Sequence, residues 1–195
     1  MFKSALLLLA IVALGQTLYI QESTFDDDQC VNSTTSYIYR EGRCQVTNAF
    51  ITASTVQYCT SSTVKTTTYV SGSCSGTGAT TEQNVNQCLT QTGDRKFSCI
   101  SAFPYVANSA ADTVTVTFGS TDCTGPVDFF AIRLNNNRNT SNCAISECSK
   151  NFDGRSSLSV CGSSPQISDY VSRFQGSASS VFVCVGLVFA ALALF

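Results

Sequence analysis

Ten cysteines distributed over the middle of this chain constrain its fold more than any other feature. An eleventh, Cys184, lies inside an apolar C-terminal segment. An even set of cysteines in a secreted chain predicts a disulfide framework, whereas a structural metal site would need clustered Cys-x-x-Cys pairs or histidines. The chain has no histidine. We therefore expect five disulfides among Cys30, Cys44, Cys59, Cys74, Cys88, Cys99, Cys123, Cys143, Cys148 and Cys161.

The pairing of ten cysteines has hundreds of solutions and does not follow from their spacing. As working hypotheses we expect three pairs, namely Cys74 with Cys88, Cys59 with Cys99 and Cys123 with Cys143.

The N-terminus has the pattern of a secretory signal peptide over residues 1–15. Lys3 gives a positive start, residues 5–14 are apolar, and Ala13 and Gly15 are small residues suited to signal peptidase. Ten apolar residues are too few to span about 30 Å of hydrocarbon. We expect the mature chain to begin near Gln16 with a polar lead-in over 16–29.

The C-terminal segment, 176–195, resembles a glycosylphosphatidylinositol (GPI) attachment signal. Residues 181–195 carry no charge, and small residues precede them. The expected attachment residue is Ser177 or Gly176, although the polar spacer is then shorter than the usual ~8–12 residues. A single-pass membrane span is the alternative, and no Lys or Arg follows it to mark a cytoplasmic side. We expect the signal and the tail to be helical.

Between these ends, Thr, Val, Tyr and Phe dominate short segments that Gly, Ser and Asn interrupt, which is typical of strands and turns. We predict an all-β, disulfide-stapled sandwich or a pair of small β subdomains over 30–175, with similar halves at 30–102 and 103–175. The strands are expected at 35–40, 45–51, 54–58, 63–70, 97–100, 113–118, 129–134 and 158–161. Residues 142–153 are expected to form a disulfide-pinned loop or a short helix, and 166–174 a final strand or a short helix.

A weak internal repeat supports the two halves. Cys74-Ser75-Gly76 matches Cys123-Thr124-Gly125, and an aromatic residue stands five positions before each cysteine. Tyr39 and Cys44 have the same spacing. We interpret each segment as a strand that ends on a buried aromatic residue, a Gly/Ser turn, and a cysteine that fixes the returning strand.

The absence of histidine excludes Ser-His-Asp and Cys-His catalysis. A hydrolase that uses paired carboxylates remains an alternative, with Asp128, Glu147 and Asp153 as candidates. We expect a protein that is not an enzyme and that needs no cofactor and no metal.

Charge and sequons point to the outside of the cell. Loss of Lys3 leaves ten basic and thirteen acidic side chains, a formal charge of −3, which argues against nucleic acid as a partner. Asn32 and Asn139 begin glycosylation sequons. We expect a glycoprotein on the outer leaflet of the plasma membrane, attached through its lipid anchor.

The unit from Tyr69 to Gly76, followed by Asn86-Gln87-Cys88, resembles segments of small cysteine-rich, GPI-anchored surface proteins of amoebae and related protists. The ending Val185–Phe195 is similar to the tail of ponticulin-type proteins, and this likeness implies a role in linking membrane and cytoskeleton. From the residues alone we expect a rigid domain for adhesion, recognition or coat formation, with an extracellular protein or glycan as partner.

Overall fold

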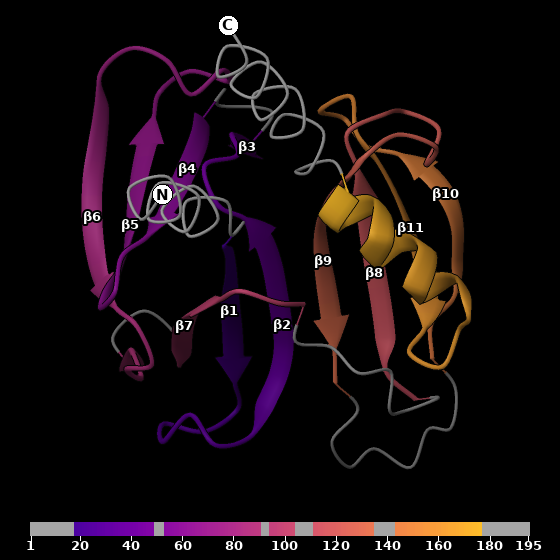
Figure 1. Ribbon diagram of the computed structural model, residues 1–195, viewed down its shortest axis with the longest axis horizontal. Coiled ribbons are helices and arrows are strands. Elements are labelled where there is room, and N and C mark those ends of the chain that lie inside the picture. Colours follow the sequence, from indigo (N-terminus) through magenta and orange to yellow (C-terminus); the bar gives the residue numbers. More distant parts are fainter. Residues whose placement is uncertain (1–17, 49–52, 91–93, 104–110, 135–142, 177–195) are drawn as a thin grey trace, which may run out of the picture.

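The computed structural model describes residues 18–48, 53–90, 94–103, 111–134 and 143–176. These residues form two antiparallel sheets and one helix at 166–176 (Figure 1). The strands are β1 (Tyr19–Phe25), β2 (Ser33–Arg40), β3 (Gln45–Asn48), β4 (Ala53–Cys59), β5 (Thr63–Tyr69), β6 (Gly78–Asn84), β7 (Arg95–Ile100), β8 (Thr113–Phe118), β9 (Val127–Arg133), β10 (Ser146–Lys150) and β11 (Ser156–Cys161).

The larger sheet has seven strands in the order β10-β11-β8-β9-β2-β1-β7, and the smaller has four in the order β3-β4-β5-β6. The prediction of a mostly β fold held by disulfides is confirmed. The run at 129–134, predicted as a strand, forms β9 in the middle of the larger sheet, where Phe130 and Ile132 are buried. The predicted signal and tail helices lie outside the described residues.

The main core lies between the seven-stranded sheet and the helix at 166–176, which crosses β8, β9 and β11 in Figure 1. Ile167, Tyr170 and Phe174 face the sheet with the spacing of one helical side. Ser164 and Pro165 precede the helix and favour its start, since Pro is well tolerated in a first helical turn. Of the two structures predicted for 166–174, the helix is the one that forms.

A second, smaller core lies between the two sheets. Ile20, Val64 and Phe97 are its buried members, and the disulfide between Cys59 and Cys99 packs beside them. This disulfide joins β4 of the small sheet to β7 of the large sheet. The two sheets are therefore fixed to each other covalently where the apolar contact between them is made.

The expected polar lead-in at 16–29 is not a lead-in, because Tyr19–Phe25 forms β1 between β2 and β7. The strand is buried on both faces, with Tyr19 toward the helix and Ile20 toward the small sheet. Its polar residues are satisfied by partners within the sheet. The hydroxyls of Ser23 and Ser36, for example, lie 3.0 Å apart in a buried hydrogen bond, so a strand of low hydrophobicity is tolerated here.

Residues 142–153 also differ from the prediction of a pinned loop or a helix. Ser146–Lys150 forms β10, an exposed edge strand of five residues paired with β11. Such a strand buries too little to show alternating hydrophobicity, so its sequence carries almost no strand signal.

The disulfides join Cys30 to Cys88, Cys44 to Cys74, Cys59 to Cys99, Cys123 to Cys148 and Cys143 to Cys161. The predicted pair Cys59–Cys99 is confirmed, whereas Cys74–Cys88 and Cys123–Cys143 are wrong. All ten cysteines of the predicted framework are paired.

The repeat is real but is placed differently from the prediction. Cys30, Cys74 and Cys123 each lie in the connection between the two strands of a hairpin. Their φ angles are positive, at 53°, 51° and 59° respectively. The hairpins are β1–β2, β5–β6 and β8–β9. An aromatic residue stands five positions before each of these cysteines, so the first copy is Phe25 with Cys30 and not Tyr39 with Cys44.

Each of these hairpins is followed in the chain by a second pair of segments, which gives three tandem units in the described part of the chain. The pairs are β3 with β4, the segment at Cys88 and Leu89 with β7, and β10 with β11. The last pair adds to its own hairpin, as β11 lies beside β8. The first two pairs are exchanged between their units. Strand β4 of the first unit lies beside β5 of the second, and β7 of the second unit lies beside β1 of the first. The repeated unit is thus smaller than the expected halves 30–102 and 103–175.

Candidate functional site

A polar cavity of about 280 Å³ lies between the two sheets, next to the smaller core. We name it the inter-sheet cavity. Strands β1, β2 and β7 of the large sheet form one wall, and β3, β4, β5 and β6 form the other. Because the pairs of the first two units are exchanged, each wall combines strands from both units.

The wall on the large sheet contributes Glu22, Tyr39, Arg95 and Phe97. Glu22 and Phe97 are opposite each other across β1 and β7. Nη1 of Arg95 donates a hydrogen bond of 3.0 Å to Oε1 of Glu22, so the carboxylate and the guanidinium neutralise each other. Burial, reinforced by the charges of Glu22 and Tyr37, raises the pKa of Tyr39, which keeps its phenol neutral.

The wall on the small sheet is a set of amides and hydroxyls. Gln57, Thr66 and Thr81 lie in register across β4, β5 and β6. Gln45 and Gln83 extend this set at either side. Side chains at alternate positions of each strand share one face, so the register itself brings these groups together.

Gln57 is the most unusual member of this wall. Its side-chain Nε2 donates a hydrogen bond of 3.3 Å to Oγ1 of Thr66. Its Oε1 is buried and has no hydrogen-bond partner in the described part of the chain, and the residue is only 9% exposed. Most buried acceptors in proteins are paired, so this oxygen is an unsatisfied acceptor on a residue that lines the cavity.

The inter-sheet cavity thus presents paired charges, amides, hydroxyls and aromatic rings in one place. Such a set suits the binding of a small polar molecule by hydrogen bonds. Sequence reasoning missed this site, since the Thr-rich composition of 63–69 indicates a strand and nothing more, and the Thr and Gln residues of 78–84 give no separate signal. The usable signal was the presence of Gln at alternate strand positions, where a buried face would normally be apolar.

The predicted carboxylates lie elsewhere. Asp128 is buried and forms an ion pair with Arg43, and Asp153 forms one with Arg155. Burial raises the pKa of Asp128, against the opposing charge of Arg43. Burial alone would also raise the pKa of Asp153, but hydrogen bonds and charge from Arg155 outweigh it and hold that pKa below its usual value. The two carboxylates are close enough to influence each other, whereas Glu147 is exposed on β10.

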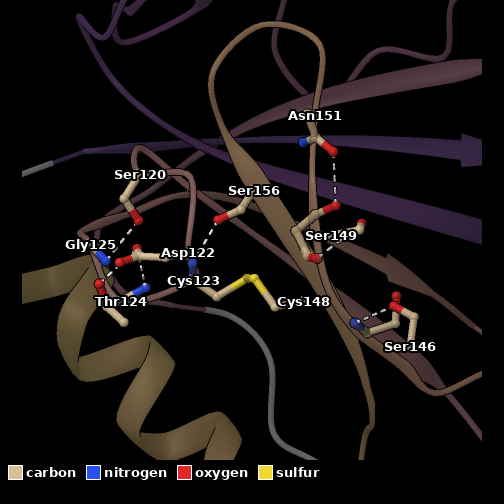
Figure 2. The surroundings of a disulfide bond; sticks show 12 residues. Ser120, Asp122, Cys123, Thr124, Gly125, Ser146, Cys148, Ser149, Asn151 and Ser156 are labelled. Atoms are coloured by element: carbon tan, nitrogen blue, oxygen red, sulfur yellow. Dashed lines mark hydrogen bonds between the residues drawn. A yellow bond between two sulfur atoms is a disulfide. The ribbon is translucent and has the colours of Figure 1, made fainter.

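The loop around Cys123 shows how tightly the hairpin ends are held (Figure 2). Oδ1 of Asp122 accepts hydrogen bonds from the backbone N–H and the hydroxyl of Thr124, at 3.1 and 2.7 Å. These bonds lower the pKa of Asp122. The hydroxyl of Ser120 accepts a hydrogen bond of 2.9 Å from the N–H of Gly125. The loop is therefore ordered by its own side chains as well as by its disulfide.

The predicted modification sites fall partly within the described residues. Asn32 is exposed in the β1–β2 loop, as an asparagine that carries a glycan must be. Gly176 ends the helix and is exposed. Asn139 and Ser177 lie outside the described residues.

Within the described ranges, no group of three or more metal-ligating side chains comes together. The same residues contain no helix with the length and apolar character to cross a membrane. Comparison with protein-family models, curated proteins and solved structures finds no match to this chain.

Proposed function

We propose that the protein is a non-enzymatic glycoprotein of the cell surface, which presents a rigid β domain for recognition of an extracellular molecule. The inter-sheet cavity carries this proposal. Its walls are built from strands that disulfides fix, and its charged pair, Glu22 and Arg95, is internally neutralised. A preorganised and internally neutralised site favours binding, because little conformational freedom is lost when a ligand enters.

The proposal includes a removable signal peptide, glycans at Asn32 and Asn139, and a lipid anchor at Ser177 or Gly176. Disulfides and glycans suit a domain that must stay folded outside the cell. A membrane or coat role that resembles ponticulin-type proteins would use the same anchor.

Binding of labelled full-length protein to cells tests the proposal. Oxidised protein should stain a cell surface in a saturable way, and unlabelled protein should compete. Protein reduced and alkylated at all cysteines is the matched control and should not stain. Absence of saturable binding to any cell or extracellular matrix would contradict the proposal.

A hydrolase is the second candidate, and one observation favours it. The environments of Asp128 and Asp153 move the pKa values of the two carboxyls in opposite directions, as in an acid and base pair. Turnover of a glycan by the wild-type protein, lost in both Asp128→Asn and Asp153→Asn but not in the exposed control Glu147→Gln, would establish it.

A further inference from the structure

We propose that the inter-sheet cavity binds a single neutral saccharide ring. This inference rests on the proposed recognition function and names the ligand class of the same site. The argument uses the charge, the hydrogen-bonding groups and the size of the cavity.

The balance of charge selects a neutral ligand. Glu22 and Arg95 are joined at 3.0 Å on the cavity wall, so their charges neutralise each other. An anion would have to displace Glu22 from Arg95, and a cation would have to displace Arg95 from Glu22. A neutral polyhydroxylated ligand can accept from or donate to the pair without breaking it.

The uncharged groups select a ligand with many hydroxyls. Gln57 offers a buried acceptor, Oε1, with no partner in the described part of the chain. Thr66 and Thr81 lie beside it in register, and each hydroxyl can both donate and accept. A sugar ring also carries neighbouring hydroxyls that donate and accept, so it can satisfy this row. An apolar ligand would leave Oε1 of Gln57 unpaired, which is unfavourable.

Size and shape limit the ligand to about one ring. The cavity volume of about 280 Å³ lies near the lower end of the range for small-molecule sites, roughly 300–1,000 Å³. Tyr39 and Phe97 add aromatic surface to one wall, against which the C–H groups of a sugar can pack. The Cys59–Cys99 disulfide joins the two walls covalently, which limits changes in their separation.

Titration of the full-length oxidised protein with methyl glycosides of common hexoses and of N-acetylglucosamine, followed by calorimetry, tests this assignment. At least one glycoside should bind with a dissociation constant near or below about 1 mM. Inorganic phosphate is the charged comparison ligand and should not bind. Gln57→Met, which removes the buried acceptor while keeping the side-chain length, should weaken binding about tenfold.

Thr81→Val is the second cavity variant and should also weaken binding, while its exposed position keeps folding unchanged. Two matched controls lie on the same strands as cavity residues but on the opposite faces. Thr80→Val is next to Thr81, and Gln21→Met is next to Glu22, and both should bind like the wild type. Melting temperatures show whether each variant is folded.

The assignment is overturned if no glycoside binds, if phosphate binds in place of the glycosides, or if a folded cavity variant keeps wild-type affinity. If Gln57→Met does not fold, Thr81→Val decides alone. Saturable staining of cells that no glycoside competes away would retain the proposed function and reject only this ligand class.

Discussion

The hydroxyl of Ser156 on β11 accepts a hydrogen bond of 2.8 Å from the backbone N–H of Cys123 (Figure 2). On the small sheet, the hydroxyl of Ser54 accepts the corresponding bond of 2.9 Å from the N–H of Cys74. Both serines are fully buried, and each lies opposite the aromatic residue that ends the first hairpin strand. One serine thus satisfies the amide of a cysteine in the left-handed conformation in two separate units.

The remaining hairpin, β1–β2, keeps the place of this acceptor but changes the residue. Asp94 stands five positions before Cys99 on β7, as Ser54 and Ser156 do before cysteines on β4 and β11. Its carbonyl accepts a hydrogen bond of 2.9 Å from the N–H of Phe25, the aromatic residue that ends β1. The three units are therefore related by backbone geometry more than by side-chain identity.

Replacing either buried serine by alanine should destabilise the fold, because a buried amide loses its acceptor. We expect Ser156→Ala and Ser54→Ala each to lower the free energy of unfolding by about 1–3 kcal/mol. Urea denaturation with all disulfides intact measures this loss. Ser163→Ala, at an exposed position, should stay within about 0.5 kcal/mol of the wild type. Equal stability of the wild type and both buried-serine variants would reject this role.

The β1–β2 loop should contribute stability that depends on pH. The carboxylate of Asp27 accepts hydrogen bonds from the backbone N–H groups of Gln29, Val31 and Asn32, and these bonds lower the pKa of Asp27. A carboxyl whose pKa is lower in the folded state stabilises the fold above its usual pKa of 3.8, and this contribution is lost as pH falls through the folded value.

Melting temperatures between pH 2 and 6 test this prediction with Asp27→Ala. The variant should melt lower than the wild type at pH 6, and the gap should close toward pH 2. Asp26→Ala is the control, since Asp26 holds none of these three amides through its side chain. A gap that stays constant with pH would show that the loop does not depend on ionised Asp27.

Phe174 should be the residue on which docking of the helix depends most. Its side chain is fully buried, and the centroid of its ring lies 5.0 Å from that of Tyr19 and 5.2 Å from that of Phe130. Phe174→Ala should cost about 3–5 kcal/mol by the loss of buried surface and the cavity left behind. Gln175→Ala, at the exposed neighbour, should be nearly neutral. Similar denaturation midpoints for the two variants would contradict the packing described.

Local sequence patterns were enough to predict the β class and most strands of both sheets. Alternating Thr and Val at 113–118 and the apolar run at 129–134 specify strands whatever surrounds them. The even cysteine set predicted complete pairing. These features depend on a few neighbouring residues, and the structure agrees with each of them.

Features that depend on distant parts of the chain were not predictable. Polar β1 is a strand because two neighbouring strands supply its hydrogen bonds and two layers bury it. Gln57 and Arg95 come together only because exchanged strands place β4 over β7. The incorrect pair Cys74–Cys88 has the same cause, since it is the pair expected if each unit kept its own strands.

The exchange of strands makes a sharp prediction about disulfide connectivity. Cys30 and Cys44, and likewise Cys74 and Cys88, are each separated by 14 positions in sequence, from 30 to 44 and from 74 to 88. Units that kept their own strands would pair them that way, as the third unit pairs Cys123 with its own β10. In the exchanged arrangement, Cys30 pairs with Cys88 and Cys44 with Cys74.

Mass spectrometry of unreduced peptides distinguishes the two arrangements. Cleavage after Arg40, Lys65 and Glu82 places the four cysteines on four different peptides, except where a bridge joins them. Peptides that contain Cys30 and Cys88, and others that contain Cys44 and Cys74, should be recovered together without reduction. Recovery of Cys30 with Cys44 would instead show that each unit folds on itself. In that case β4 could not lie beside β5 with the register seen here, and the inter-sheet cavity would lose the wall that carries Gln57.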